Sequence, residues 1–168
     1  MAYQRFEDLP VWNSAIDLAL RVYEFTSKPE FTGRYSLKDQ LERAAVSVSN
    51  NIAEGFERGT TQELLTFLYI ARGSAGEVRS MLTLLERLKV FLNFKSEISN
   101  LKSKAENISR QLRGWADSLQ NSEIRGQRYL TARSRKQSKA AREREEFLSE
   151  LAEIRAEGKA KPAGTTDN

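Results

Sequence analysis

Apolar residues recur at helical spacing in four segments of the chain. In the first, from about Leu9 to Ser27, one stripe repeats every three or four residues, as in a helix that packs one face on a core. The stripe is Trp12, Ala15, Ile16, Ala19, Val22 and Tyr23, broadened by Val11, Leu18 and Phe25. Its breadth predicts contact with more than one neighbour. Pro10 fits the first turn, and Pro29 with Gly33 predicts a loop after the helix.

The second segment opens at Ser36, and Asp39 three residues later resembles a capping box with Asp in place of Glu. Its apolar face comprises Leu37, Leu41, Ala44, Ala45, Val48 and Ile52. A second stripe of the same period is polar. It comprises Arg43, Ser47, Asn50 or Asn51, Glu54 and Arg58. Gly55 and Gly59 lie near the expected end of this helix, where Gly commonly caps.

The third segment runs from Thr60 or Thr61 to about Lys89, with Thr60 and Glu63 as a capping box. It carries two seams, which predict two partner surfaces. The first seam is Leu64, Phe67 or Leu68, Ala71, Ala75, Val78, Leu82 and Leu85. The second is Phe67, Ile70, Ser74, Glu77, Met81, Leu84 and Leu88. Gly73 and Gly76 each cost a helix about 1 kcal/mol relative to Ala, so their presence predicts a close backbone crossing there.

The fourth segment runs from about Ser96 to Leu119 and shows a strict heptad pattern, which implies left-handed knobs-into-holes packing. The heptad residues are Ile98, Leu101, Ala105, Ile108, Leu112, Trp115 and Leu119. No segment alternates as a strand would. Four amphipathic helices with short links predict an all-α, up-down antiparallel four-helix bundle.

The composition changes after Asn121, which predicts a bundle over 1–121 and a separate tail over 122–168. The whole chain has a net charge of +4, and the tail alone has 11 Lys or Arg against 8 Asp or Glu. The bundle is therefore nearly neutral. Within the tail, the basic residues from Arg125 to Arg144 are opposed only by Glu143, which gives that stretch a net charge of +7, and an acidic stretch follows it. The basic residues are Arg125, Arg128, Arg133, Arg135, Lys136, Lys139, Arg142 and Arg144.

Clustered arginines neutralise phosphates and release counterions, so these eight residues are candidates for nucleic-acid binding. Tyr129 lies among them and could stack on a base. The alternative is a solvated helix of mixed charge, from about Thr131 to Glu157. Its short apolar stripe would then dock on another helix. That stripe is Phe147, Leu148, Leu151 and Ile154. The tail is thus expected to be a helical or disordered extension.

The absence of both Cys and His excludes many chemistries. Serine triads, His-ligated metals, thiolate nucleophiles, disulfides and zinc fingers all need one of these residues. We therefore expect no metal and no cofactor. The N-terminus does not read as a signal peptide, and no stretch approaches the roughly 20 apolar residues of a membrane span. A cytoplasmic protein is the expectation.

The polar stripe of the second segment has two interpretations. It could be an active site, with Glu54 or Glu77 serving a hydrolase. It could instead be a hydrogen-bonded network between helices, in which Arg43 pairs with Glu54 or Glu77, because buried charge must be paired. No nucleophile, base and orienting group converge in the sequence, so the network is favoured.

Several short motifs resemble one bacterial family of four-helix bundles. They are Phe6, Leu9, Val11-Trp12, Ala15, Gln40, Arg43-Ala44-Ala45, Ser47, Asn51-Ile52-Ala53-Glu54-Gly55, Arg58, Phe67, Ile70-Ala71, Gly73-Ser74 and Glu77. The family's founding members are encoded in intervening sequences of 23S ribosomal RNA genes. The likeness covers about Phe6 to Leu119, and the run Asn51–Gly55 is its most specific piece. One departure is Lys28-Pro29, where Phe-Pro is more usual.

The resemblance implies a small non-enzymatic bundle that assembles as a ring-like homopentamer. The same bundle serves as the accessory variability protein of diversity-generating retroelements, which binds nucleic acid and partners a reverse transcriptase. The basic tail favours this role, and a scaffold without nucleic-acid binding is the alternative. In a ring, a polar network is expected to fix the register between helices or subunits. Its residues are Arg43, Ser47, Asn51, Glu54, Arg58, Ser74 and Glu77.

Overall fold

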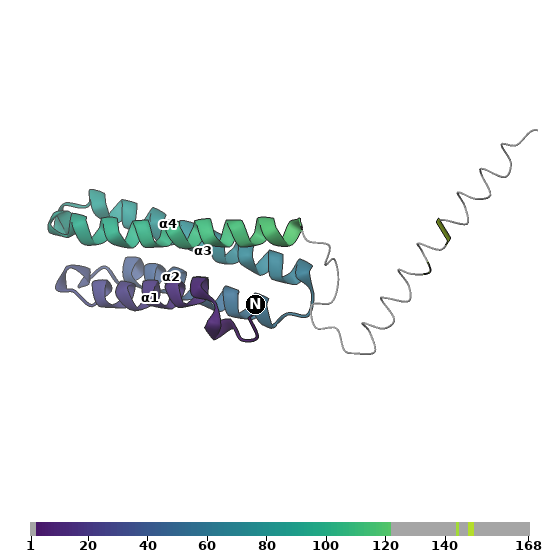
Figure 1. Ribbon diagram of the computed structural model, residues 1–168. Coiled ribbons are helices and arrows are strands. Elements are labelled where there is room, and N and C mark those ends of the chain that lie inside the picture. The colour runs from purple at the N-terminus through teal and green to yellow at the C-terminus, as the bar shows by residue number, and fades with distance from the viewer. Residues whose placement is uncertain (1–2, 122–143, 145–147, 150–168) are drawn as a thin grey trace, which may run out of the picture. The chain divides into compact units, whose positions relative to one another are not determined.

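The computed structural model describes residues 3–121, 144 and 148–149, and four long helices make up most of that part. They are α1 (Pro10–Thr26), α2 (Tyr35–Glu57), α3 (Thr61–Arg87) and α4 (Lys95–Gln120) (Figure 1). Of three short 3-10 helices, Phe6–Asp8 precedes α1, whereas Pro29–Phe31 and Lys89–Phe94 lie in the first and last connections. The described residues contain no strand. The predicted all-α class is confirmed.

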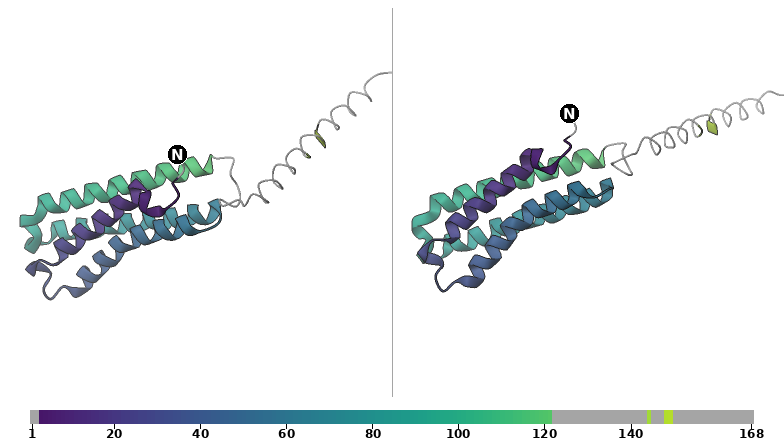
Figure 2. Two further views of the ribbon diagram at one scale, coloured as in Figure 1. Left: turned by 60° about the horizontal axis from the view of Figure 1, so that its bottom comes forward. Right: turned by 90° about the horizontal axis from the view of Figure 1, so that it is seen from below.

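Consecutive helices run antiparallel and lie side by side, because the connections between them are short. Figure 2 shows the same order from two further sides: α2 lies between α1 and α3, and α4 returns beside α1 and α3. The predicted up-down topology is confirmed. Within the described residues, none of the helices has the length and apolar character that crossing a membrane requires.

The chain divides into two units, residues 1–128 and 129–168, and the four helices belong to the first. The boundary expected after residue 121 stays a prediction. The predicted basic residues from Arg125 to Arg142, with Tyr129, lie outside the described residues, as do Phe147, Leu151 and Ile154. Arg144, Leu148 and Ser149 are helical.

The core forms where the four apolar stripes meet. In α1 the fully buried line is Ala15, Leu18, Val22 and Phe25, whereas Tyr23 is 49% exposed. The expected breadth of the apolar face of this helix is confirmed, but the centre of that face is shifted from Tyr23 toward Leu18 and Phe25. The predicted first seam of α3 is buried throughout, with Leu68 and not Phe67 at its second position. In α4 the buried line follows the heptad up to Leu112 and then passes to Ala116, leaving Trp115 and Leu119 partly buried.

One end of the bundle is closed by an aromatic cluster. Phe25 of α1 meets Phe31 of the first connection with ring centroids 5.3 Å apart, and Phe31 meets Phe91 of the last connection at 4.9 Å. All three side chains are buried. Aromatic pairs at these separations contribute about 0.5–1.5 kcal/mol beyond their area burial. The cluster therefore joins two loops that are far apart in the sequence.

Two helix starts test the predicted capping boxes. At α3 the Thr60 cap is confirmed, because its hydroxyl accepts from the Glu63 backbone N–H at 3.2 Å; the Glu63 carboxylate accepts from the same hydroxyl at 2.8 Å, where a capping box would use the Thr60 backbone N–H. At α2 the prediction is wrong. Buried Phe31 and the turn at Gly33, whose φ is +77°, bring the chain into helix at Tyr35. Ser36 already lies inside the first turn, and no side chain caps this end.

The close approach of two helix backbones is at Gly55, not at Gly73 or Gly76. A Cβ on Gly55 would lie 2.6 Å from the Cβ of Phe67, whereas one on Gly73 or Gly76 would meet nothing within 4 Å. The crossing predicted at Gly73 and Gly76 is therefore wrong. The physical reason is rotational: both lie on the side of α3 that faces away from its buried residues. Gly55 instead lets α2 pack directly against α3.

We expect Gly55→Ala and Gly73→Ala to change stability in opposite directions. Overpacking at Gly55 should lower the free energy of unfolding by about 1–3 kcal/mol. Gly73→Ala removes a flexible residue from a helix and should raise it by up to about 1 kcal/mol. Urea denaturation followed by circular dichroism measures both. Equal effects of the two changes would contradict the close approach at Gly55.

The ion pair between Asp17 of α1 and Lys104 of α4 should make stability depend on pH. The hydrogen bond from Lys104 lowers the pKa of Asp17, and Arg21 at 3.1 Å lowers it further. Because this pKa is lowered, the ionised Asp17 stabilises the fold at pH values above its unfolded-state pKa of about 4. The stabilisation is lost as the pH falls through the lower pKa of the folded state. Asp17→Asn should thus cost about 0.5–1 kcal/mol at pH 7. Its difference from the original chain should shrink between about pH 4 and 2. A difference that is unchanged at pH 2, measured by urea denaturation, would contradict this.

Candidate functional site

Three residues of the predicted polar network meet between α2 and α3. The Asn51 side-chain amide donates to the Ser47 carbonyl at 2.7 Å and to its hydroxyl oxygen at 3.0 Å. The Ser47 and Ser74 hydroxyls lie 2.9 Å apart, and Ser74 donates to the Ile70 carbonyl at 3.1 Å. Each hydroxyl has one proton, so the bonds form a chain from Asn51 through Ser47 and Ser74 to Ile70. This chain of bonds fixes the register of α2 against α3.

The other members of the predicted network lie apart from this cluster. Arg43 does not pair with Glu54 or Glu77: its partner is Asp39 on its own helix, at 3.3 Å, and its side chain is 73% exposed. Glu77 accepts from Gln40 at 3.0 Å. A residue four positions away on one helix is a near neighbour, so an outward-facing Arg finds Asp39 before any acid across the interface.

Glu54 and Arg58 form a surface pair at the end of α2. The Arg58 guanidinium also lies 3.9 Å from Glu63 and 5.1 Å from the centre of the Phe67 ring. The Glu54 side chain is 49% exposed. Glu54 and Glu77 thus each have a partner at the surface, which gives no support to a hydrolytic site. Within the part of the chain that the structure describes, no three carboxylates come together as metal ligands would.

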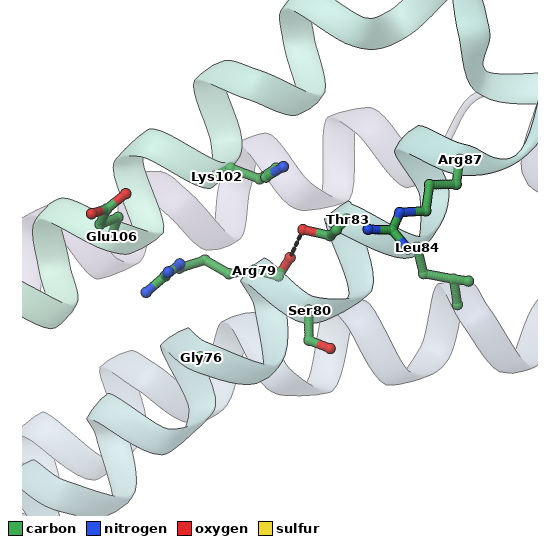
Figure 3. Close-up of a pocket in the computed structure, with 8 residues that line it drawn as sticks. All are labelled: Gly76, Arg79, Ser80, Thr83, Leu84, Arg87, Lys102 and Glu106. Carbon is green, nitrogen blue, oxygen red and sulfur yellow. Dashed lines mark hydrogen bonds between the residues drawn. The ribbon is translucent and has the colours of Figure 1, made fainter.

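A groove that the sequence did not indicate lies between α3 and α4. It has a volume of about 720 Å³. Figure 3 shows its lining, in which the Thr83 hydroxyl donates to the Arg79 carbonyl at 2.8 Å. The lining residues are Gly76, Arg79, Ser80, Thr83, Leu84 and Arg87 of α3 with Lys102 and Glu106 of α4. Three of the eight are basic, and the small residues leave the groove open.

Arg72, Arg79 and Arg87 form what we call the arginine ladder. At 3.6 residues per turn they fall within an arc of about 80° on the side of α3 that borders the groove, and they span about 22 Å along its axis. Arg79 and Arg87 are exposed, and Arg72 is partly so. Among residues 3–121, no carboxylate oxygen lies within 4.0 Å of any of the three guanidinium groups.

The acids nearest the groove are matched by other cations. Lys102 donates to Glu86 at 2.8 Å, and this hydrogen bond lowers the pKa of Glu86, with smaller contributions from Lys95 and Arg87. Glu106 pairs with Arg110 on its own helix at 3.8 Å. Among the described residues, Arg72 and Arg79 therefore have no close acidic partner, and Arg87 has only its neighbour Glu86, which Lys102 already pairs.

The chain matches the family described as "23S rRNA-intervening sequence protein" over residues 7–114. It belongs to this family. The match covers α1, α2, α3 and most of α4, and thus both the polar cluster and the arginine ladder. The family's description names no enzymatic reaction and no retroelement. Residues 122–168 lie beyond the match. No curated protein matches the chain.

The polar residues between α2 and α3 should differ sharply in their contribution to this intervening-sequence bundle. Ser74→Ala breaks the chain of hydrogen bonds and should lower the free energy of unfolding by about 1 kcal/mol or more. Glu54→Ala removes only a surface pair and should lower it by no more than about 0.5 kcal/mol. Thermal melts with light scattering measure both. A large loss or a smaller assembly with Glu54→Ala would instead place Glu54 in a subunit contact.

Proposed function

We propose that this member of the intervening-sequence family is a non-catalytic accessory protein that binds nucleic acid through its phosphates. The observation that carries the proposal is the arginine ladder: three guanidinium groups in line on α3, with no carboxylate oxygen within 4.0 Å among residues 3–121. Guanidinium groups bind phosphate oxygens in a bidentate manner and remain charged at every physiological pH. Such contacts give affinity without reading sequence.

The basic stretch of the tail supplies a second set of phosphate contacts in this proposal. Its eight Lys and Arg residues between Arg125 and Arg144 are opposed only by Glu143. Arg144 is the one of them within the described residues, and it is exposed. Each phosphate contact adds to the release of counterions. The two sets together would give tight binding that weakens steeply with salt.

The likeness to accessory variability proteins supports a specific role for this binding. The protein would hold template RNA or cDNA for a reverse transcriptase in a diversity-generating retroelement, as a homopentamer in the cytoplasm. A reverse-transcriptase gene and a pair of near-repeats beside the coding sequence would support this role. A position inside a ribosomal RNA gene would instead favour the intervening-sequence setting.

A specific observation favours a second candidate, an oligomeric scaffold that does not bind nucleic acid. The second seam of α3 is only partly covered, since Ile70 and Leu84 are each 45% exposed. Leu20 and Tyr23 of α1 are 59% and 49% exposed. Exposed apolar side chains that gather on one face mark protein contacts. Two such faces would suit a ring, in which each subunit has two neighbours.

Replacing the arginine ladder should reduce the salt dependence of RNA binding. In the full chain, Arg72→Gln, Arg79→Gln and Arg87→Gln together should lower the slope of log K against log salt by about 2 for a single strand, at 0.7 per phosphate. The matched control replaces Arg21, Arg34 and Arg43 by Gln, with the same loss of charge. Fluorescence anisotropy with a labelled RNA oligonucleotide at several salt concentrations gives both slopes.

Two results would contradict the proposal in different ways. A flat salt dependence for the original chain would favour the scaffold. Equal slopes for the ladder variant and the control would remove the ladder from the site. A third variant, with Arg133, Arg135 and Lys136 replaced by Gln, measures the share of the tail and is also expected to lower the slope.

A further inference from the structure

We propose that the arginine ladder takes single-stranded nucleic acid, with Tyr69 as the surface on which a base stacks. This inference rests on the proposed function and names the class of ligand. Tyr69 lies three residues before Arg72 on α3, within the same arc of about 80° that holds the three arginines. Its side chain is 43% exposed. An aromatic ring thus stands at one end of a line of phosphate-binding groups.

The Tyr69 ring is held in place by α4. The side-chain amide of Gln120, the last residue of that helix, donates to the Tyr69 hydroxyl oxygen at 2.8 Å. A ring restrained before binding loses less rotamer entropy when a base stacks on it. Because this hydrogen bond involves only the hydroxyl at the edge of the ring, the partly exposed side chain remains accessible. Tyr69 is therefore prepared for stacking.

The spacing along α3 suits a single strand of nucleic acid. Tyr69 and Arg87 are about 27 Å apart along the helix axis, and successive arginines are about 11 Å apart. At about 3.4 Å per stacked nucleotide, this corresponds to roughly three nucleotides between arginines. Between them, Gly76 has no side chain and a Cβ there would meet nothing within 4 Å. The surface therefore lets a nucleic-acid backbone approach the helix closely.

Stacking on Tyr69 would distinguish single-stranded from double-stranded nucleic acid. A single strand exposes the faces of its bases, and each base stacked on an aromatic side chain contributes about 1–3 kcal/mol irrespective of sequence. In a duplex those faces are covered by the neighbouring base pairs, so Tyr69 would have no base to receive. Arg72, Arg79 and Arg87 would bind the phosphates of either form. The preference for a single strand therefore depends on Tyr69.

The experiment compares two probes on the full chain by fluorescence anisotropy. They are a labelled 15-nucleotide oligo(U) and a labelled 15-base-pair RNA duplex. Tyr69→Leu should weaken binding of the oligo(U) by about 5-fold to 150-fold, which is the stacking energy above converted to affinity. Binding of the duplex and the salt slope should not change, because no charge is lost. Tyr69→Phe keeps the ring and should retain most of the affinity.

The control is Tyr35→Leu, at an exposed tyrosine near the start of α2 that is 71% exposed and lies outside the ladder. It should leave both affinities unchanged. Thermal melts and light scattering verify that each variant keeps its fold and mass. If Tyr69→Leu weakens neither probe, or weakens both equally, the single-strand assignment is overturned while the ladder variant can still support the proposed function. If the ladder variant also changes nothing, the proposed function falls with it.

Discussion

The close contact of α2 with α3 at Gly55 fixes the rotation of α3, and the other surfaces of the molecule depend on that rotation. A Cβ at Gly55 would lie 2.6 Å from the Cβ of Phe67, so the two helices meet here without an intervening side chain. The Ser47 and Ser74 hydroxyls, 2.9 Å apart, hold the same register about two turns away. With one face of α3 held on α2 and another on α4, a single outward arc is left for solvent and ligands.

That rotation explains why the charged residues of α3 show a pattern in the structure that the sequence does not reveal. The helix has three arginines and three glutamates, and its net charge is zero. In the structure Glu77 accepts from Gln40 of α2, Glu86 accepts from Lys102 of α4, and Glu63 lies at the capping box. Each acid thus has a polar partner, whereas the three arginines have no carboxylate oxygen within 4.0 Å among residues 3–121. Counting charges along the chain could not reveal this difference in pairing.

The fold itself was predictable because burial follows the helical period. The repeats of Leu, Ile, Val and Ala located all four helices, and Thr60 located the start of α3. Local signals failed where tertiary contacts decided the outcome. Ser36 looked like a cap, but buried Phe31 brings the chain into helix before it. Gly73 and Gly76 looked like a crossing point, but they face outward, and the residue that needed to be small was Gly55.

Assembly and nucleic-acid binding, if both occur, would use different arcs of α3. Ile70 and Leu84, exposed apolar members of the second seam, lie about 120° and 80° around the helix from Gly76, counting 100° per residue. A second copy packed at Ile70 would leave Arg79 accessible, whereas one that reached Leu84 would cover one edge of the groove. Each added subunit would then bring another ladder to the same strand. Binding at one ladder raises the effective concentration of the strand at the next, so weak contacts with a few phosphates would combine into tight, non-specific retention.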